Sequence, residues 1–426
     1  MPTDRPRSGK PDTAAAATTS IPVVLVDDSR VSRRFLRSAL ESTPEFEVVG
    51  EASNGREAVA QVERLRPAAV LMDLDLPIMN GMEAIERIMA IRPTPIVVYS
   101  AFVDADHSAN VMEALAAGAV DVFAKPEWGE GGRLDEHADE LRRRLRVAAR
   151  VKVITHPRGR LRGADPGVRD LKASAVPALP AEAPPAQATA EQRPVARTAV
   201  KAPGPASTVA LPDTPSASTS RPDRRRATEK IEPRTTITQL VAIGASTGGP
   251  QALATVLSNL PADFSPAILV VQHMAEGFIP GLVSWLDGLL ALRVVQGESG
   301  RRLQPGTITV APSGRNLLVQ TRLRVVCEPA PAKQFHIPGI DASFTSVAEA
   351  VGAEAVGVLL TGMGRDGAVG LKAMRDRGAT TLGQDEATSA VYGMPQAGFE
   401  LGAVEHQLPI GEIGPALLTL VQGTSA

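Results

Sequence analysis

Three residue types that together can activate a hydroxyl group stand far apart in this chain of 426 residues. Each follows a short apolar run: Ser246 follows Leu240 to Ile243, His273 follows Ala267 to Val271, and Asp366 follows Val356 to Leu360. A serine hydroxyl is a weak nucleophile until a base removes its proton, and that base needs a carboxylate to fix its tautomer. The three residues could therefore form a hydrolytic triad.

The apolar runs predict the elements that must position these side chains. Each run is short and rich in β-branched residues, which favours a buried strand over a helix. In an open parallel sheet the carboxyl ends of all strands lie at one edge, and ligands bind in the crevice outside that edge. We therefore expect Ser246, His273 and Asp366 to meet there.

The serine lies in a glycine-rich turn, Gly244 to Pro250, that joins a predicted strand to a predicted helix. Pro250 suits the first helical turn, and the helix N-terminus offers N–H groups to an oxyanion. The G-x-S-x-G spacing is that of a nucleophile elbow, although such turns also cradle phosphate or simply pack tightly. The chain order Ser, His, Asp differs from the Ser, Asp, His order of α/β-hydrolases.

A second group of polar residues follows the predicted strands of the N-terminal half. The group comprises Asp27, Asp28, Asp73, Ser100 and Lys125. Three carboxylates at one sheet edge repel one another unless a divalent cation joins them, and Mg²⁺ prefers carboxylates, water and phosphoryl oxygens. Such a site could accept a phosphoryl group, whereas any one of these residues alone could be a loop cap or a surface charge.

The predicted elements of the N-terminal half alternate between strand and helix, which indicates a small doubly wound sheet. The predicted strands are Val23–Val26, Val48–Gly50, Ala69–Met72, Ile96–Tyr99 and Val120–Phe123. The predicted helices include Val31–Leu40, Arg56–Leu65, Met82–Met89 and a closing helix at Leu134–Ala149. After Thr235 the alternation resumes and continues almost to the end of the sequence, which predicts a second parallel-sheet α/β domain.

Composition excludes several classes of protein. The net charge of −2 argues against a nucleic-acid binder held by bulk electrostatics, and basic runs such as Arg142–Arg150 are usually solvated helix faces. The single cysteine, Cys327, excludes an internal disulfide framework and fits a reducing compartment. Residues 1–20 lack the apolar core of a signal peptide, so we expect a soluble, cytoplasmic protein without membrane insertion.

The N-terminal half resembles the receiver domain of bacterial response regulators across its full length. Pro77 and Gly81 after Asp73, and Pro126 after Lys125, belong to the same pattern. The resemblance implies Asp73 as phospho-acceptor, Asp27 and Asp28 with Asp73 as Mg²⁺ ligands, and Ser100 and Lys125 as switch and phosphate-contact residues. It also implies a chemotaxis-type histidine kinase as phosphodonor. Val122 departs from the pattern, because such domains often place an aromatic switch residue there.

The C-terminal half, from about Thr238 to Val421, resembles the catalytic domain of chemotaxis-type protein-glutamate methylesterases. The resemblance rests on the turn at Ser246, on Val271–Met274, on Thr361–Gly367 and on Val391–Pro395. It implies hydrolysis of glutamyl methyl esters, and deamidation of glutamines, on the cytoplasmic helices of methylated chemoreceptors. Ser246 would be nucleophile, His273 the base and acid, and Asp366 its orienter, with no cofactor. Thr247 and Met363 are candidates for the substrate or oxyanion loop.

The predicted organisation is a disordered tail (1–20), a receiver domain (21–140), a helical extension with an Ala- and Pro-rich linker (141–234), and the catalytic domain (235–426). The linker composition cannot bury enough apolar surface to fold.

Four positions carry a residue other than the one that is usual in the methylesterase pattern: Ile279, Trp285, Asn316 and Ile337. Polar groups that could line a substrate groove are replaced, so the partner could differ from a standard receptor helix. Two alternatives therefore stay open: a receiver-controlled signalling or binding module that keeps the triad, and a serine esterase that acts on a non-receptor partner.

Overall fold

The computed structural model describes residues 20–101, 105–126, 134–151, 153, 231, 236–331, 334 and 336–421. Almost all of the predicted N-terminal tail and most of the predicted linker lie outside these ranges. Within the ranges, every helix is too short or too polar to span a bilayer.

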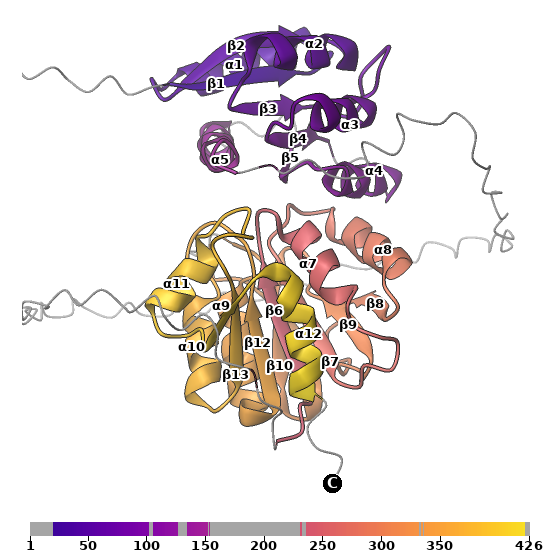
Figure 1. Ribbon diagram of the computed structural model, residues 1–426, viewed down its shortest axis with the longest axis vertical. Coiled ribbons are helices and arrows are strands. Elements are labelled where there is room, and N and C mark those ends of the chain that lie inside the picture. The colour runs from indigo at the N-terminus through magenta and orange to yellow at the C-terminus, as the bar shows by residue number, and fades with distance from the viewer. Residues whose placement is uncertain are drawn as a thin grey trace, which may run out of the picture. The chain divides into compact units, whose positions relative to one another are not determined.

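The N-terminal sheet has five parallel strands in the order β2-β1-β3-β4-β5 (Figure 1). The strands are β1 (Ile21–Val26), β2 (Phe46–Ala52), β3 (Ala69–Met72), β4 (Ile96–Ser100) and β5 (Asp121–Ala124). The helices are α1 (Arg30–Glu41), α2 (Gly55–Leu65), α3 (Gly81–Ile91), α4 (Ala105–Ala116) and α5 (Leu134–Ala148). Contacts pair α1 with α5 and join α2 to α3 and α3 to α4, so helices cover both faces. The predicted doubly wound sheet is confirmed.

Burial and capping explain these elements. All four residues of β3 and all five of β4 are buried, as expected for central parallel strands that are covered on both faces. The side chains of Asn54 and Asn80 accept hydrogen bonds from the backbone N–H groups of Glu57 and Glu83 at the starts of α2 and α3.

The C-terminal sheet has seven parallel strands in the order β14-β13-β12-β6-β7-β9-β8. The strands are β6 (Leu240–Ala245), β7 (Ala267–Gln272), β8 (Arg293–Gln296), β9 (Thr307–Val310), β12 (Ala355–Leu359), β13 (Thr380–Gln384) and β14 (His406–Leu408). The helices are α7 (Gly249–Leu257), α8 (Ile279–Leu289), α9 (Ile340–Ala350), α10 (Ala368–Asp376), α11 (Met394–Glu400) and α12 (Ile410–Val421). Contacts join α9 to α10 and α10 to α11, and α7 to α8 and α12, in two layers (Figure 1).

The expected alternation of strand and helix is interrupted in the middle of the C-terminal half. No α-helix separates β8 from β9, and β10 (Arg315–Gln320) pairs with β11 (Arg324–Pro329) as an antiparallel hairpin outside the main sheet. A short 3-10 turn at Thr321–Leu323 joins these two strands. Both strands mix buried, half-buried and exposed residues instead of being buried throughout, which marks the hairpin as half-exposed.

The central strands of this sheet determine where the chemistry can occur. Strand β6 lies between β12 and β7, with Gly244 opposite Leu359 on one side and Ala245 opposite Gln272 on the other. The residues that follow these three strands therefore emerge at neighbouring points of one edge.

Candidate functional site

His273 and Asp366 meet at the carboxyl edge of the C-terminal sheet. The Nε2 atom of His273 lies 2.7 Å from Oδ2 of Asp366, and the two side chains are 6% and 16% exposed. His273 follows β7 directly, whereas Asp366 lies further from β12, in the loop that precedes α10. Ser246 follows β6, and its backbone N–H donates to the carbonyl of Thr361 at 3.0 Å. The structure thus places all three residues at the predicted edge.

Backbone amides hold the Asp366 carboxylate on both of its oxygen atoms. The N–H of Ile340 donates to Oδ2 at 2.8 Å, and the N–H groups of Asp341 and Gly367 donate to Oδ1 at 2.9 and 3.0 Å. Ile340 and Asp341 open helix α9, whose N-terminus favours negative charge. Burial opposes ionisation, but the hydrogen bonds from His273 and from these amides outweigh it and lower the pKa of Asp366 to about 2.

The state of Asp366 determines the tautomer of His273. An ionised carboxylate only accepts hydrogen bonds, so Nε2 of His273 carries a proton, and in the neutral ring Nδ1 is then the nitrogen with the lone pair. Nδ1 is buried and has no hydrogen-bond partner, Ser246 included, among the described residues. The nitrogen left to serve a hydroxyl is thus Nδ1, the reverse of the common arrangement, in which Nδ1 faces the carboxylate. Nucleophile–base hydrogen bonds are often long before a substrate binds.

The turn that carries Ser246 is tightly packed, and tight packing was one of the roles that its glycine-rich sequence allowed. Gly248 has a φ of 74°, and a Cβ atom on Gly249 would lie 2.0 Å from Oε1 of Gln272. Nε2 of Gln272 also donates to the carbonyl of Ser246 at 2.9 Å. Pro250 stands in the first turn of α7, as predicted. The tight packing fixes the serine backbone directly before a helix N-terminus.

Thr247 and Met363 lie in the two loops beside the serine. The carbonyl of Thr247 accepts a hydrogen bond from Thr361 Oγ1 at 3.0 Å. Gly362, the neighbour of Met363, lies so close to the serine that a Cβ atom on it would be 2.7 Å from the Cβ of Ser246. The loop of Met363 therefore abuts Ser246 and continues to Asp366.

Two further residues at this edge escaped the sequence analysis. The ring of His336 stacks on that of His273, with centroids 4.5 Å apart and planes at 13°. Asp341 accepts a hydrogen bond from the N–H of Gly370 at 2.7 Å. Burial raises the pKa of Asp341; the Gly370 amide opposes the shift and the charge of Asp366 reinforces it. The only sequence signal for His336 was its place immediately before Ile337, one of the four positions that depart from the family pattern.

The four positions that depart from the methylesterase pattern do not share one environment. Ile279 and Asn316 are buried, and Asn316 is fully engaged in hydrogen bonds to Gln334 and Gly339. Trp285 and Ile337 are half-buried. The side chain of Asn316 thus connects strand β10 to the segment before α9, and the placement of the four positions along a substrate groove stays a prediction.

The predicted acidic site forms at the carboxyl edge of the N-terminal sheet. Asp27, Asp28 and Asp73 each offer a carboxylate oxygen, and these atoms lie within 4.8 Å of one another. Nζ of Lys125 lies 2.5 Å from Oδ2 of Asp73 and 2.9 Å from Oδ2 of Asp27. Asp27 also accepts hydrogen bonds from Ser32 Oγ at 2.7 Å and from the Ser29 N–H at 2.9 Å. The predicted carboxylates and lysine are thus brought together.

Charge and burial compete within this acidic site. Burial raises the pKa of Asp73 to about 6; Lys125 opposes the shift and the charge of Asp27 reinforces it. Burial opposes the charge of Lys125, but Asp73 and Asp27 together raise its pKa. A cation at the site would favour the charged form of Asp73 and lower the pKa of its carboxyl group.

Ser100 ends β4 opposite Ala124, the residue before Lys125. Among the residues that the structure describes, its hydroxyl donates one long hydrogen bond of 3.4 Å, to the carbonyl of Ala101. Val122 is buried, and the aromatic group near the lysine is Tyr99, whose ring centroid lies 5.6 Å from Nζ of Lys125. An aromatic side chain is thus present beside the site, although from β4 instead of β5.

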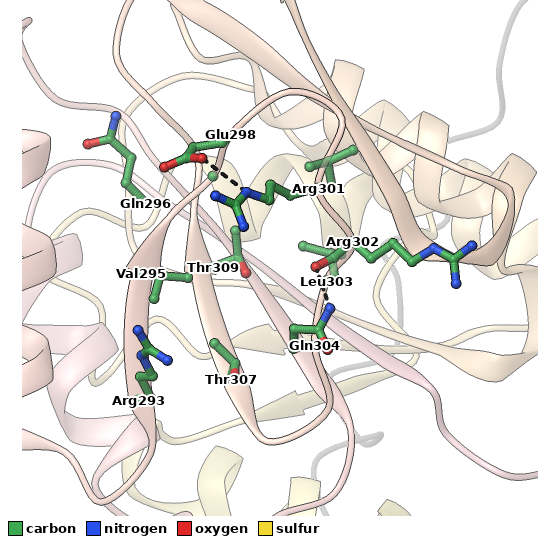
Figure 2. Close-up of a pocket in the computed structure, with 12 residues that line it drawn as sticks. Arg293, Val295, Gln296, Glu298, Arg301, Arg302, Leu303, Gln304, Thr307 and Thr309 are labelled. Carbon is green, nitrogen blue, oxygen red and sulfur yellow. Dashed lines mark hydrogen bonds and ion pairs between the residues drawn. The ribbon is translucent and has the colours of Figure 1, made fainter.

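A pocket of about 390 Å³ lies at the far edge of the C-terminal sheet, between β8 and β9 and the loop that joins them (Figure 2). Its lining includes Arg293, Gln296, Thr307 and Thr309, and the exposed pair of Arg301 and Glu298 lies at one end of it. None of the residues predicted to act chemically lines this pocket.

Comparison with known proteins extends over almost the whole chain. Residues 241–417 match the CheB methylesterase family and residues 23–133 match the response regulator receiver domain. The protein-glutamate methylesterase/protein-glutamine glutaminase 3 of Paramagnetospirillum magneticum is 37% identical, over 94% of this chain and 96% of the relative. A second such relative, from Anaeromyxobacter dehalogenans, is 38% identical over 94% and 97%. The solved catalytic domain of the Thermotoga maritima CheB methylesterase is 33% identical over 42% of this chain and 97% of that chain, with a TM-score of 0.41.

Proposed function

Because the chain belongs to the family of protein-glutamate methylesterases that carry a receiver domain, we propose that it hydrolyses glutamate methyl esters on chemoreceptors and deamidates glutamines. The observation that supports the chemistry best is the contact of His273 with Asp366 beside Ser246, at one edge of the sheet. The family also supports cytoplasmic receptor helices as substrate and a chemotaxis-type histidine kinase as phosphodonor.

Acyl transfer follows from the tautomer of His273. Nδ1 takes the proton of Ser246 Oγ as this oxygen attacks the ester carbonyl carbon, and the imidazolium is stabilised by Asp366 through Nε2. The tetrahedral intermediate collapses when the same proton passes to the methoxy oxygen, which leaves as methanol. A water molecule then attacks the acyl-serine with Nδ1 as base, and this step releases the glutamate carboxylate and restores the serine.

The developing oxyanion needs hydrogen-bond donors close to Ser246. The backbone N–H of Thr247, in the turn that precedes α7, and the loop of Met363 are the groups placed to provide them. We assign these two residues to the oxyanion or substrate loop on this ground.

The acidic site supports phosphorylation of Asp73. Its donor set of three carboxylates suits Mg²⁺, which Asp27, Asp28 and Asp73 would hold and which would supply positive charge to incoming phosphoryl oxygens. Lys125 is placed to contact a phosphoryl group on Asp73, because its Nζ already lies against Oδ2 of that residue. Ser100 is the switch candidate, since it ends strand β4 opposite the residue before Lys125 and its hydroxyl makes a long hydrogen bond to the neighbouring carbonyl of Ala101.

A fluorophosphonate probe separates this function from a binding module. We expect the probe to form one covalent adduct on Ser246, measured by intact mass and peptide mapping, because only an activated serine attacks phosphorus at a useful rate. Ser246→Ala should abolish the adduct, and Ser313→Ala, which changes a serine outside the triad, should keep it. A wild-type chain that stays unlabelled would favour the binding module over the enzyme.

A further inference from the structure

We propose that His336 is a positioning residue for this hydrolysis: its ring holds the imidazole of His273 in the plane that joins Nε2 to Asp366 and leaves Nδ1 to Ser246. The inference rests on the proposed function, because it concerns the base of that reaction.

The hydrogen bond to Asp366 alone does not fix the plane of the His273 ring. A histidine ring turns about a broad terminal torsion, and one hydrogen bond at Nε2 restrains the ring at one end only. Nδ1 has no hydrogen-bond partner among the described residues, so no hydrogen bond restrains the ring at the position where it must meet the serine. A flat group packed on one face supplies the missing restraint, and the ring of His336 lies within 13° of parallel at 4.5 Å.

His336 is itself held by a hydrogen-bonded frame around Asn316. The backbone carbonyl of His336 accepts from Nε2 of Gln334 at 2.6 Å, and the side chains of Gln334 and Asn316 exchange two hydrogen bonds of 2.8 Å. Asn316 also accepts from the N–H of Gly339 at 2.7 Å. The frame therefore attaches the His336 segment to strand β10, in which Asn316 lies.

The same segment positions both partners of the pair. Directly after Gly339, the N–H groups of Ile340 and Asp341 hold the Asp366 carboxylate, while His336 lies against His273. A Cβ atom on Gly339 would lie 2.3 Å from Nε2 of Gln334, so a larger residue there would displace the Gln334 side chain from the frame. One short stretch of chain thus sets the position of the carboxylate and the plane of the base.

A neutral ring suits this role. Burial, together with the positive charge that His273 carries when protonated, lowers the pKa of His336 to about 4. At neutral pH the ring then adds no charge beside the base, and it presents a π face to the imidazolium that forms when His273 takes the serine proton.

Three substitutions in the full chain separate stacking from bulk and from nitrogen chemistry. His336→Phe keeps a flat ring without nitrogen, His336→Leu fills part of the space without a flat face, and His336→Ala removes both. His406→Ala changes a histidine in the edge strand β14, outside the site, and is the matched control. The measured quantities are kcat and KM for ester hydrolysis and the rate of fluorophosphonate labelling, all with Mg²⁺ and acetyl phosphate present.

We expect His336→Ala and His336→Leu to lower kcat and the labelling rate by roughly 10- to 100-fold, the scale of a small misplacement of a reacting group. KM should change little, and His336→Phe and His406→Ala should remain close to the wild type. Thermal unfolding shows which variants fold. If His336→Ala does not fold, the kcat and labelling rate of His336→Phe are compared with those of His336→Leu instead.

Two results would overturn the positioning role. One is labelling of His336→Leu at the wild-type rate, and the other is a folded His336→Phe as slow as His336→Leu. A wild-type chain that is not labelled at all would instead refute the proposed function, so the two failures are distinguishable.

Discussion

Ser246→Ala and His273→Gln should each lower ester hydrolysis by about 10⁴- to 10⁶-fold, because a nucleophile and its base act as a unit. For the same reason, the double variant should lose little more than either single one. Turnover with an excess of enzyme measures losses of this size. Multiplicative losses in the double variant would mean that Ser246 and His273 do not form one constellation.

Asp366→Asn should lower activity on a similar scale and, unlike the other two changes, should also destabilise the fold. Both carboxylate oxygens accept backbone N–H groups, so an asparagine must turn its NH₂ group toward a donor. A buried donor left without an acceptor costs about 1–3 kcal/mol. Denaturant unfolding compares this variant with Ser246→Ala, which should unfold like the wild type. Equal free energies of unfolding for the two variants would contradict a stabilising role for the backbone N–H groups that hold Asp366.

The second large effect concerns control by the N-terminal domain. We expect a fragment that starts near Thr235 to hydrolyse ester faster than the unphosphorylated full chain, by roughly 5- to 150-fold, the usual range of an allosteric coupling. The hypothesis is that the unphosphorylated receiver domain docks near the catalytic edge and obstructs Ser246. A long linker gives only a modest effective concentration, so this inhibited state requires an interface of its own. The C-terminal sheet has a buried core of its own, which allows the fragment to fold.

Phosphorylation of the full chain should recover the activity of the fragment. Acetyl phosphate with Mg²⁺ is the condition, and Asp73→Asn or removal of Mg²⁺ by a chelator is the control, since each disables the acidic site. Equal activity of the fragment and the unphosphorylated chain would exclude inhibition and leave stimulation or recruitment as the role of the receiver domain.

The sequence predicted what depends on continuous apolar runs. Strands such as β3 and β7 are buried along their whole length, so their composition alone identifies them, and the residues that follow them fall at one edge. The hairpin of β10 and β11 was missed because its residues are only partly buried and it stands outside the main sheet.

The missed parts of the site depend on contacts between distant segments. Two of the hydrogen bonds to Asp366 come from backbone N–H groups at the start of α9, which any residue type except proline could supply. The stack of His336 on His273 joins a loop to the end of a strand, and neither residue reveals the other by its spacing. The choice of Nε2 over Nδ1 for the carboxylate is likewise a matter of geometry and cannot be read from residue types.

The central claim is that this chain removes methyl groups from receptor glutamates through Ser246, and release of labelled methanol from receptor membranes methylated with a labelled methyl donor tests it most directly. With acetyl phosphate and Mg²⁺ present, we predict methanol release by the wild-type chain and only background release by Ser246→Ala. If the wild-type chain is labelled by the fluorophosphonate probe but releases no more methanol than Ser246→Ala, the methylesterase assignment is contradicted and an esterase with a different partner remains.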